Sequence, residues 1–447
     1  MARENRLIVV FGGGVQHLPV ATRLDRRATM GAMSGTGVAT DHSRADAIIR
    51  ELLTKPYPND PYPLYHELRA LDPVFASETG MWVLTSYEAC ALVFRSPSFG
   101  QGEAAELVRQ DPRYEWSTVL QSLGHMMVFM DPPDHTRLRK IMSRSFSPKV
   151  IDRLRPYVQQ VVDDLLAPLD GAAEADLVTQ FADLIPVTVI CELLGVPHAD
   201  HEQCRAWSEE IALAIEPVVA DECLRRADAA TNAYLEYFTA LIAEKRIRPR
   251  DDLLTLLTRA EDDGDQLTTD ELVAMATLLL GAGFETTRNG IAGGIHALLT
   301  HPDELAQLRS DPTLDRAMVD EILRYVSPNQ TAVARFALED VEIGRTLVPK
   351  GAVTAPVIAA ANRDPARFGD PDRLDLDRPD NLPLTFAPGP HLCLGAPVAR
   401  LEVELAVSTL VRRFPDLALL DDNPPLRDTC NLGPGPRGPS HLRVALG

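Results

Sequence analysis

The residues with the clearest capacity for chemistry lie in one short segment, which reads Phe-Ala-Pro-Gly-Pro-His-Leu-Cys-Leu-Gly over residues 386–395. It presents a single cysteine, Cys393, just before a stretch with helical apolar spacing that begins at about Ala396. A thiol at the start of a helix lies near unpaired N–H groups and the positive end of the helix dipole, and both favour the thiolate. Gly389 and Gly395 permit close backbone approach. A thiolate held in this way serves as a nucleophile or as a metal ligand.

The pattern F-x-x-G-x-x-x-C-x-G is specific, because the composition of the chain predicts on the order of 10⁻³ chance matches to it. A buried structural cysteine is the alternative for Cys393. It is the expectation for the remaining cysteines, which behave as small buried hydrophobes: Cys90, Cys191, Cys204, Cys223 and Cys430. No C-x-x-C pair is present, so neither a disulfide framework nor a zinc site is predicted.

A second chemical signal lies inside a long apolar stretch that begins with the capping-box sequence at residues 268–271. Gly281 and Gly283 are followed by Glu285 and Thr286. A glycine within a helix costs up to ~1 kcal/mol relative to alanine, and a buried carboxylate is costly unless it is paired or hydrated. Small residues at a helix–helix contact are the alternative, but both costs within one turn indicate function.

The segment around Cys393, together with residues 395–400, resembles the heme-binding segment of the cytochrome P-450 superfamily, and residues 282–287 resemble its oxygen-activating segment. The fit is to soluble bacterial members and covers roughly Tyr57 to the C-terminus. The resemblance implies that Cys393 is the axial thiolate of the iron of heme b, within a loop that contains Phe386 and Gly389. Residues 387–388 depart from the family, which often has glycine and a polar residue there.

The same resemblance implies the roles of the acid–alcohol pair. Thr286 would hydrogen-bond the bound dioxygen, and Glu285 would relay protons to it through water. Ala282 and Phe284 would lie at the substrate, although Phe284 occupies a position that is often polar and is able to face a neighbouring helix instead.

Heme carries two carboxylates that need cationic or hydrogen-bonding partners. Residues 131–146 match the family segment for this task, and His135 and Arg139 fall on one face of the predicted helix. Arg335 and His391 are the other candidates.

A charge pair is expected to support the cysteine loop. Glu321-x-x-Arg324 matches the E-x-x-R of the family, and Arg378 lies in a segment that resembles the one supplying a second arginine. The spacing alone is weak, because an exposed i,i+3 helix pair is the ordinary explanation for it.

Substrate identity is constrained only by apolar character. The resemblance suggests a pocket formed by residues 100–129, 211–219, 329–334 and 431–433 with the oxygen-activating helix, and it implies that Val333 and Leu432 touch substrate. A medium-to-large, mainly hydrophobic ligand is expected, and relatives often tailor natural products by hydroxylation, epoxidation or oxidative coupling.

These residues require long helices to position them, and the sequence favours a mainly α-helical fold with a smaller β region. Helices are expected over residues 60–73, 134–146, 148–169, 177–194 and 201–246, a strand over 81–87, and a hairpin over 341–348. The resemblance implies heme between the oxygen-activating helix and the helix after Cys393. Residues 1–42 are expected to be a disordered extension and 43–447 a single domain.

Composition excludes several classes of function. The net charge is −20, which argues against binding to nucleic acid. No segment has the ~20 consecutive apolar residues that a membrane span needs. We therefore expect a monomeric protein of the cytoplasm.

The chain has no flavin or nucleotide domain, so electrons from NAD(P)H would arrive through a ferredoxin reductase and an acidic ferredoxin. The basic residues expected to form its docking patch lie on two predicted helices: Arg137, Arg139, Lys140, Arg144, Arg400, Arg412 and Arg413.

The function that follows is that of a heme-thiolate monooxygenase. A peroxide-using enzyme or an isomerase with the same ligand is one alternative, and a non-catalytic partner protein is another. The presence of both Glu285 and Thr286 argues against each of them.

Overall fold

The computed structural model describes residues 42–54, 58–102, 108–212, 214, 221–259, 261–262, 265–421, 424–426 and 435–447. The predicted N-terminal extension, apart from its last residue, lies outside the described residues, and so do Leu432 and Cys430.

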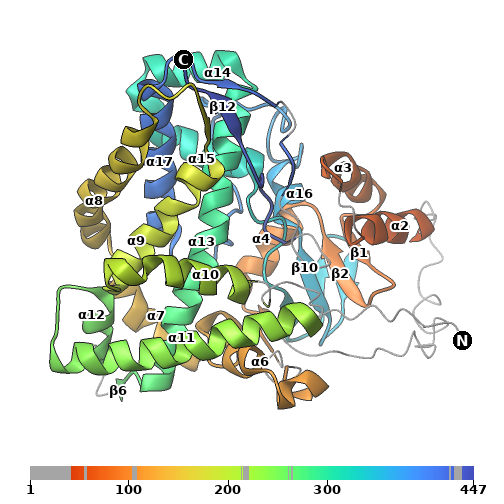
Figure 1. The fold of residues 1–447 in the computed structure, drawn as a ribbon. Helices are drawn as coiled ribbons and strands as arrows, with labels where there is room; N and C mark the ends of the chain where they lie inside the picture. The colour runs from red at the N-terminus through yellow and green to blue at the C-terminus, as the bar shows by residue number, and fades with distance from the viewer. Residues whose placement is uncertain are drawn as a thin grey trace, which may run out of the picture.

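Helices make up most of this structure (Figure 1). They are α2 (His42–Leu52), α3 (Tyr62–Leu71), α4 (Tyr87–Arg95), α6 (Thr118–Leu123), α7 (Asp134–Arg144), α8 (Pro148–Leu166), α9 (Leu184–Leu194), α10 (His201–Ala212), α11 (Asp221–Ile247), α12 (Leu253–Arg259), α13 (Thr269–Leu299), α14 (Pro302–Ser310), α15 (Asp315–Val326), α16 (Ile358–Asn362) and α17 (Ala396–Arg413). Short helical turns are Pro112–Glu115, Met127–Phe129, Ala167–Leu169, Val178–Ala182, His198–Asp200 and Pro312–Leu314.

The strands are short and form small sheets. They are β1 (Val74–Ala76), β2 (Met81–Leu84), β3 (Phe99–Gly100), β4 (Glu174–Asp176), β5 (Glu261–Asp262), β6 (Asp265–Gln266), β7 (Arg335–Ala337), β8 (Val341–Ile343), β9 (Thr346–Val348), β10 (Val353–Pro356), β11 (Ala418–Leu419) and β12 (Arg443–Ala445). The largest sheet has the order β1-β2-β10-β7-β3, and β10 runs parallel to β2. The predicted mainly α fold with a smaller β region is confirmed.

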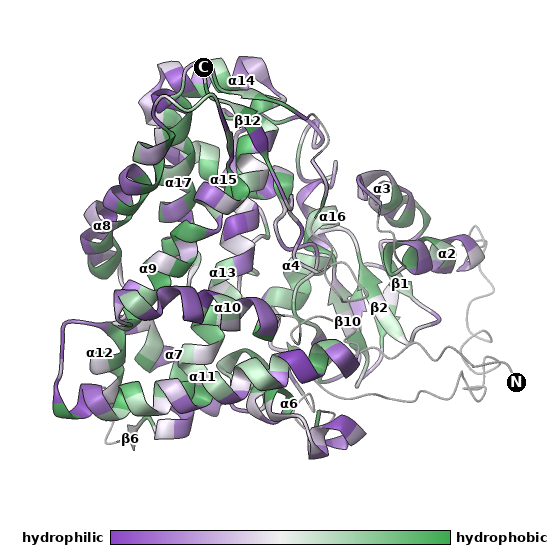
Figure 2. Cartoon of the chain, viewed as in Figure 1, coloured by the Kyte–Doolittle hydropathy of each residue, from purple (hydrophilic) through white to green (hydrophobic). Residues whose placement is uncertain are grey.

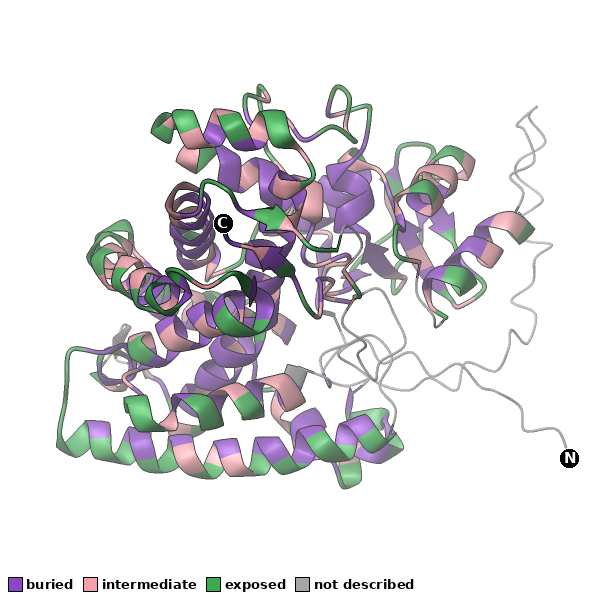
Figure 3. Ribbon diagram, turned by 45° about the horizontal axis from the view of Figure 1, so that its top comes forward, coloured by how far each residue is buried: buried purple, intermediate pink, exposed green. Residues whose placement is uncertain are grey.

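The long helix α13 runs through the middle of the helical part (Figures 1 and 3). Thr268 caps it through the predicted capping box, in which the Thr268 side chain accepts from the N–H of Glu271 and the Glu271 carboxylate accepts from the N–H of Thr268. Its 31 residues span about 46 Å at 1.5 Å per residue. It packs on α9, α10, α11, α15 and α17, so almost every face of the helix is buried.

The amphipathic helices lie around this centre. Figure 2 shows polar and apolar residues alternating along α8 and α11, as expected of helices that bury one face and expose the other. Among the residues that the structure describes, no helix is both long and apolar enough to cross a membrane.

Two predicted elements have other bounds than expected. The predicted helix over residues 201–246 is two helices, α10 and α11, and the sequence between them contains Pro217, a helix breaker. The predicted strand over residues 81–87 ends at Leu84, because the Ser86 side chain accepts from the N–H of Ala89 and begins α4.

Apart from Cys393, the cysteines were expected to be small buried residues, and most of those described are. Cys90, Cys191 and Cys204 are free and buried. Cys223, on α11, is engaged in a disulfide bond, so the prediction of a plain buried thiol is wrong for this residue.

Candidate active site

The loop before α17 is a tight turn that fixes the position of Cys393. The Cys393 N–H donates to the Phe386 carbonyl at 3.0 Å, and the Leu392 N–H donates to the Gly389 carbonyl at 3.0 Å. Gly389 has a φ of +139°, and a Cβ there would lie 1.9 Å from the carbonyl oxygen of Phe94 on α4. Only glycine lets the loop rest against α4 in this way.

The sulfur of Cys393 lies at the N-terminus of α17, within reach of the N–H groups of Gly395 and Ala396. These groups and the guanidinium groups of Arg139 and Arg400 lower the pKa of the thiol, but burial has the larger effect and raises it. The N–H groups of the helix terminus therefore favour the thiolate, as expected, while burial opposes it. Cys393 nevertheless keeps exposed surface, so a partner such as a metal ion has access to it.

An open stripe runs along one face of α13. From Leu272 to Ile295 every residue is buried except Leu278, Ala282, Gly283 and Thr286. The first, second and last of these follow the i, i+4, i+8 spacing of one helix face. Ala282 and Thr286 were predicted from the sequence, whereas Leu278 was not, although its position one turn before Ala282 was an available signal.

The glycines of α13 have two different uses. A Cβ at Gly293 would lie 2.5 Å from Cγ1 of Val326, and one at Gly294 would lie 2.7 Å from Cγ2 of Ile322, so both positions are needed for packing against α15. A Cβ at Gly283 would meet nothing within 4 Å. Helix packing therefore explains Gly293 and Gly294 but not Gly283.

The acid–alcohol pair lies on this stripe and at its edge. The Thr286 hydroxyl donates to the Ala282 carbonyl at 2.9 Å, and the Glu285 side chain is buried. Phe284 is 1% exposed and packs in the main hydrophobic core. Of the two orientations considered for Phe284, the described contacts are those with the neighbouring helices, because a helix turns by about 100° per residue and carries Phe284 away from the face of Ala282 and Thr286.

Four basic side chains meet near Cys393, namely His135 and Arg139 from α7, Arg335 from β7 and His391 from the cysteine loop. The rings of His135 and His391 lie 4.1 Å apart. Burial lowers the pKa of His391 to about 3, and the charges of Arg335, His135 and Arg139 add to this effect. Burial likewise lowers the pKa of Arg335 to about 10. The guanidinium charges of Arg139 and Arg335, beside the N–H groups of two histidines, suit an anionic partner.

The cluster of His135, Arg139, Arg335 and His391 lacks a sufficient acceptor within the described part of the chain. Nε2 of His135 is buried there without a hydrogen-bond partner. Asp131 is the carboxylate that acts on His135 and Arg335, and its oxygens accept the N–H groups of Gln101 and Gly102 at 2.8 Å.

The structure brings Glu321, Arg324 and Arg378 together in a buried network. Arg324 donates to the Glu321 carboxylate through two bonds of 2.8 Å, and Nε of Arg378 lies 3.1 Å from Oε2 of Glu321. Arg324 also donates to the carbonyls of Asn362, Pro371 and Arg373, and both Glu321 and Arg324 are fully buried.

Asn362 continues this network toward the cysteine loop, and the sequence analysis missed it. Its Nδ2 donates to Ser327 at 3.0 Å and to Thr385 at 3.2 Å, and its Oδ1 accepts the Leu384 N–H at 2.7 Å. Thr385 directly precedes Phe386. No local sequence pattern predicts this role, because the contacts join distant segments.

Val333 was predicted from the family resemblance to touch substrate. It is partly buried and packs, together with Leu278, against a small apolar cluster that includes Leu120 and Phe129. The segment over residues 100–129, expected to contribute to the pocket, contains α6 and two helical turns within its described part.

The expected basic patch is weaker than the sequence suggested. Arg400 pairs with Asp320 at 3.0 Å and Arg412 with Asp315 at 2.6 Å. Arg137 pairs with Glu271, and Arg413 with Asp170. Lys140 and Arg144 on α7 remain exposed.

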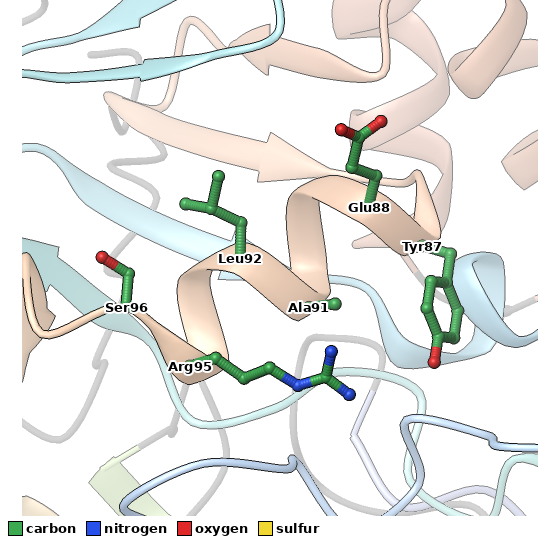
Figure 4. A pocket seen from close by; sticks show the side chains of 6 residues that line it. All are labelled: Tyr87, Glu88, Ala91, Leu92, Arg95 and Ser96. Carbon is green, nitrogen blue, oxygen red and sulfur yellow. The ribbon is translucent and has the colours of Figure 1, made fainter.

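The hollow shown in Figure 4 lies on the outer side of α4, lined by Tyr87, Glu88, Ala91, Leu92, Arg95 and Ser96. Because Gly389 touches the backbone of Phe94 and Arg95, this hollow borders the cysteine loop. It is distinct from the open stripe on α13.

Comparisons with known proteins agree with this geometry. The cytochrome P450 family matches residues 218–433. Cytochrome P450 monooxygenase PikC of Streptomyces venezuelae is 40% identical over 370 residues, which cover 80% of this chain and 85% of PikC. The 6-deoxyerythronolide B hydroxylase of Saccharopolyspora erythraea is 42% identical over 290 residues, covering 65% of this chain and 70% of that enzyme.

Solved structures share the fold. Mycobacterium smegmatis CYP164A2 superposes with a TM-score of 0.79 at 38% identity, covering 90% of this chain and 100% of that one. The chain therefore belongs to the cytochrome P450 family, and its helices and small sheets form the P450 fold. It is a cytochrome P450 monooxygenase, as the sequence resemblance implied.

The family implies a heme-thiolate cofactor, and the residues present fit it. An accessible thiol stands at the start of α17, and a buried basic cluster contains a histidine nitrogen without a partner among the described residues. A heme offers an iron for the thiolate and carboxylates for the cluster.

Proposed function

We propose that this monooxygenase inserts one atom of dioxygen into a medium-to-large, mainly hydrophobic substrate, as a tailoring step in bacterial natural-product synthesis. The open stripe on α13 carries the proposal, because Leu278 and Ala282 offer apolar surface beside Thr286. The names of two relatives support the substrate class: 6-deoxyerythronolide B hydroxylase, and mycinamicin IV hydroxylase/epoxidase of Micromonospora griseorubida at 37% identity. Hydroxylation, epoxidation and oxidative coupling all suit this surface.

Cys393 would hold the iron of heme b, and His135, Arg139, Arg335 and His391 would donate to its carboxylates. A bound heme supplies dioxygen activation at an iron that receives electron density from the thiolate. The cysteine loop, with Phe386 and Gly389, keeps the sulfur at one position, and Glu321, Arg324 and Arg378 anchor the segment before it.

Thr286 and Glu285 would manage protons at the open stripe. Because the Thr286 hydroxyl donates to Ala282, its oxygen keeps lone pairs that accept a hydrogen bond from a water molecule or a substrate hydroxyl. Glu285 is one residue away and buried, and it would supply protons through water to the position that Thr286 orders.

Electrons would come from NAD(P)H in the cytoplasm through a ferredoxin reductase and an acidic ferredoxin, and the chain would act as a monomer. We place the docking surface around Arg95, Lys140, Arg144 and the exposed Leu392, on the side of the cysteine loop. The charge reversal Lys140→Glu should weaken ferredoxin binding at low salt and much less at high salt. Unchanged binding at both salt concentrations would argue against this surface.

Isotopically labelled dioxygen tests the proposed reaction. With reductase, ferredoxin and a macrolide-like substrate panel, one labelled atom should enter the product and the other should enter water. A product labelled only from peroxide, or rearranged without added oxygen, would instead assign a peroxygenase or an isomerase. Loss of product in Thr286→Ala, with peroxide release retained, would support the proton-delivery role.

A further inference from the structure

Gln101 has a buried amide whose donor is unused in the described structure. The residue is 1% exposed, and its Nε2 atom has no hydrogen-bond partner within the described ranges. An unsatisfied buried donor costs about 1–3 kcal/mol, so such a group is expected to have a partner in the working protein.

The sheet places Gln101 beside Arg335. Strands β3 and β7 are antiparallel, with Phe99 opposite Ala337 and Gly100 opposite Phe336. The next position along the same register sets Gln101 opposite Arg335, and side chains opposite each other in an antiparallel pair share one face of the sheet. Arg335 is 4% exposed, and its Nη1 donates to carbonyls of its own segment, those of Val333 and Ala334.

A second set of contacts ties Gln101 to the basic cluster. The N–H of Gln101 donates to Oδ1 of Asp131 at 2.8 Å, and Asp131 acts electrostatically on both Arg335 and His135. A Cβ at Gly100 would lie 2.6 Å from Oδ1 of Asp131, so glycine at position 100 makes this close approach possible. The backbone around Gln101 is thus held against the carboxylate that borders the cluster.

Two of the buried donors that have no partner in the described residues, Nε2 of His135 and Nε2 of Gln101, therefore belong to one neighbourhood. Neither donor bonds to Asp131, whose oxygens accept the backbone N–H groups of Gln101 and Gly102 instead. The neighbourhood is rich in positive charge, and an amide donor added to it suits a carboxylate from outside the chain.

We propose that the Gln101 side-chain amide donates to a carboxylate of the heme, alongside Arg335, and is a further cofactor-binding residue of this enzyme. The inference rests on the proposed cofactor role of the basic cluster. A hydrogen bond to a charged group that is lost on substitution corresponds to a roughly tenfold to hundredfold weaker interaction.

The test compares heme loss from the holoenzymes of three variants by transfer to excess apomyoglobin. Gln101→Leu removes the donor at similar size, and Gln101→Glu replaces it with a group that repels the heme carboxylate. Gln159→Leu is the control, because Gln159 on α8 is partly buried and donates to the Thr409 hydroxyl at 3.2 Å, outside the basic cluster and the cysteine-loop network.

We expect Gln101→Leu to lose heme about tenfold to hundredfold faster than the unsubstituted enzyme, Gln101→Glu to lose it faster still, and Gln159→Leu to match the unsubstituted enzyme. Heme retention in both Gln101 variants equal to that of the unsubstituted enzyme would overturn the inference. So would unchanged heme loss with a weakened substrate-induced spectral shift, which would place the amide at the substrate. If Gln101→Leu fails to fold, the rate of heme loss from Gln101→Glu alone tests the inference. An unsubstituted enzyme without a heme-thiolate spectrum would refute the proposed function instead.

Discussion

Ala387 and Gly389 of the cysteine loop both have a positive φ, but substitution should change the stability of the protein in opposite directions at the two positions. Gly389, at φ +139°, has no room for a Cβ, since the carbonyl of Phe94 would lie 1.9 Å away. Gly389→Ala should lower the free energy of unfolding by roughly 3 kcal/mol or more and reduce heme content. Urea unfolding and heme quantification measure both effects.

Ala387 provides the matched comparison. It carries a Cβ at φ +47°, where glycine is favoured, so Ala387→Gly should raise the free energy of unfolding by about 0.5–1 kcal/mol. Equal stability of the Gly389→Ala variant and the unsubstituted protein would show that the loop does not rest on α4 as described.

Glu402 is a buried carboxyl on α17 that lies away from the cysteine loop. It is 3% exposed, and burial, the sole cause of the shift, raises its pKa to about 8. The folded state therefore keeps a proton that the unfolded state releases above its ordinary pKa near 4.5. Between these two values, stability falls by about 1.4 kcal/mol for each pH unit as pH rises.

Glu402→Gln removes this loss, so its free energy of unfolding relative to the unsubstituted protein should increase from pH 5 to pH 8. Glu404→Gln is the control on the same helix, because Glu404 is paired with Arg155 at 2.9 Å. Parallel stability curves for Glu402→Gln and the unsubstituted protein would contradict the burial of this carboxyl.

At the scale of elements, α13 combines packing against α15 with an open face. Gly293→Ala should lower stability by about 1–3 kcal/mol, because its Cβ would lie 2.5 Å from Val326. Gly283→Ala should keep or raise stability, by up to ~1 kcal/mol from helix propensity. Its methyl group would enter the open stripe and slow carbon monoxide binding to the reduced enzyme.

Unfolding free energies and flash-photolysis rebinding rates separate the two glycines. A Gly283→Ala variant that is destabilised like Gly293→Ala, or that binds carbon monoxide at an unchanged rate, would show that the stripe is not the gas-binding face.

Elements specified by local signals were predictable from the sequence. The capping box of Thr268 and Glu271 and the β8–β9 hairpin depend on residues a few positions apart, and both are confirmed. Ser86 was a missed local signal, because the apolar run before it suggested a longer strand. The sequence left two orientations open for Phe284, since the choice depends on which face of α13 the neighbouring helices cover.

The same distinction applies to the residues of the site, since some are identified by short sequence motifs and others only by contacts between distant segments. The positions of Cys393 and Thr286 follow from short motifs. Asn362 and Gln101 act through partners far along the chain, at Leu384 and Asp131, and no spacing rule reveals such contacts.

At the scale of the whole molecule, we propose that residues 43–447 form one domain. The largest sheet supports this, because β2 and β3, from residues 81–100, pair with β10 and β7, from residues 335–356. A fragment beginning at residue 108 lacks β1, β2 and β3 and should show no cooperative unfolding transition by circular dichroism. A fragment that unfolds cooperatively and binds heme would instead divide the chain into separate domains.

The central claim is that the sulfur of Cys393 binds heme iron, and the difference spectrum of the reduced protein with carbon monoxide tests it most directly. The account predicts the strongly red-shifted Soret band of a thiolate-ligated heme in the unsubstituted protein and in Cys90→Ser, and its loss in Cys393→His with heme still bound. The same red-shifted band in Cys393→His, or its absence from the heme-loaded unsubstituted protein, would contradict the claim.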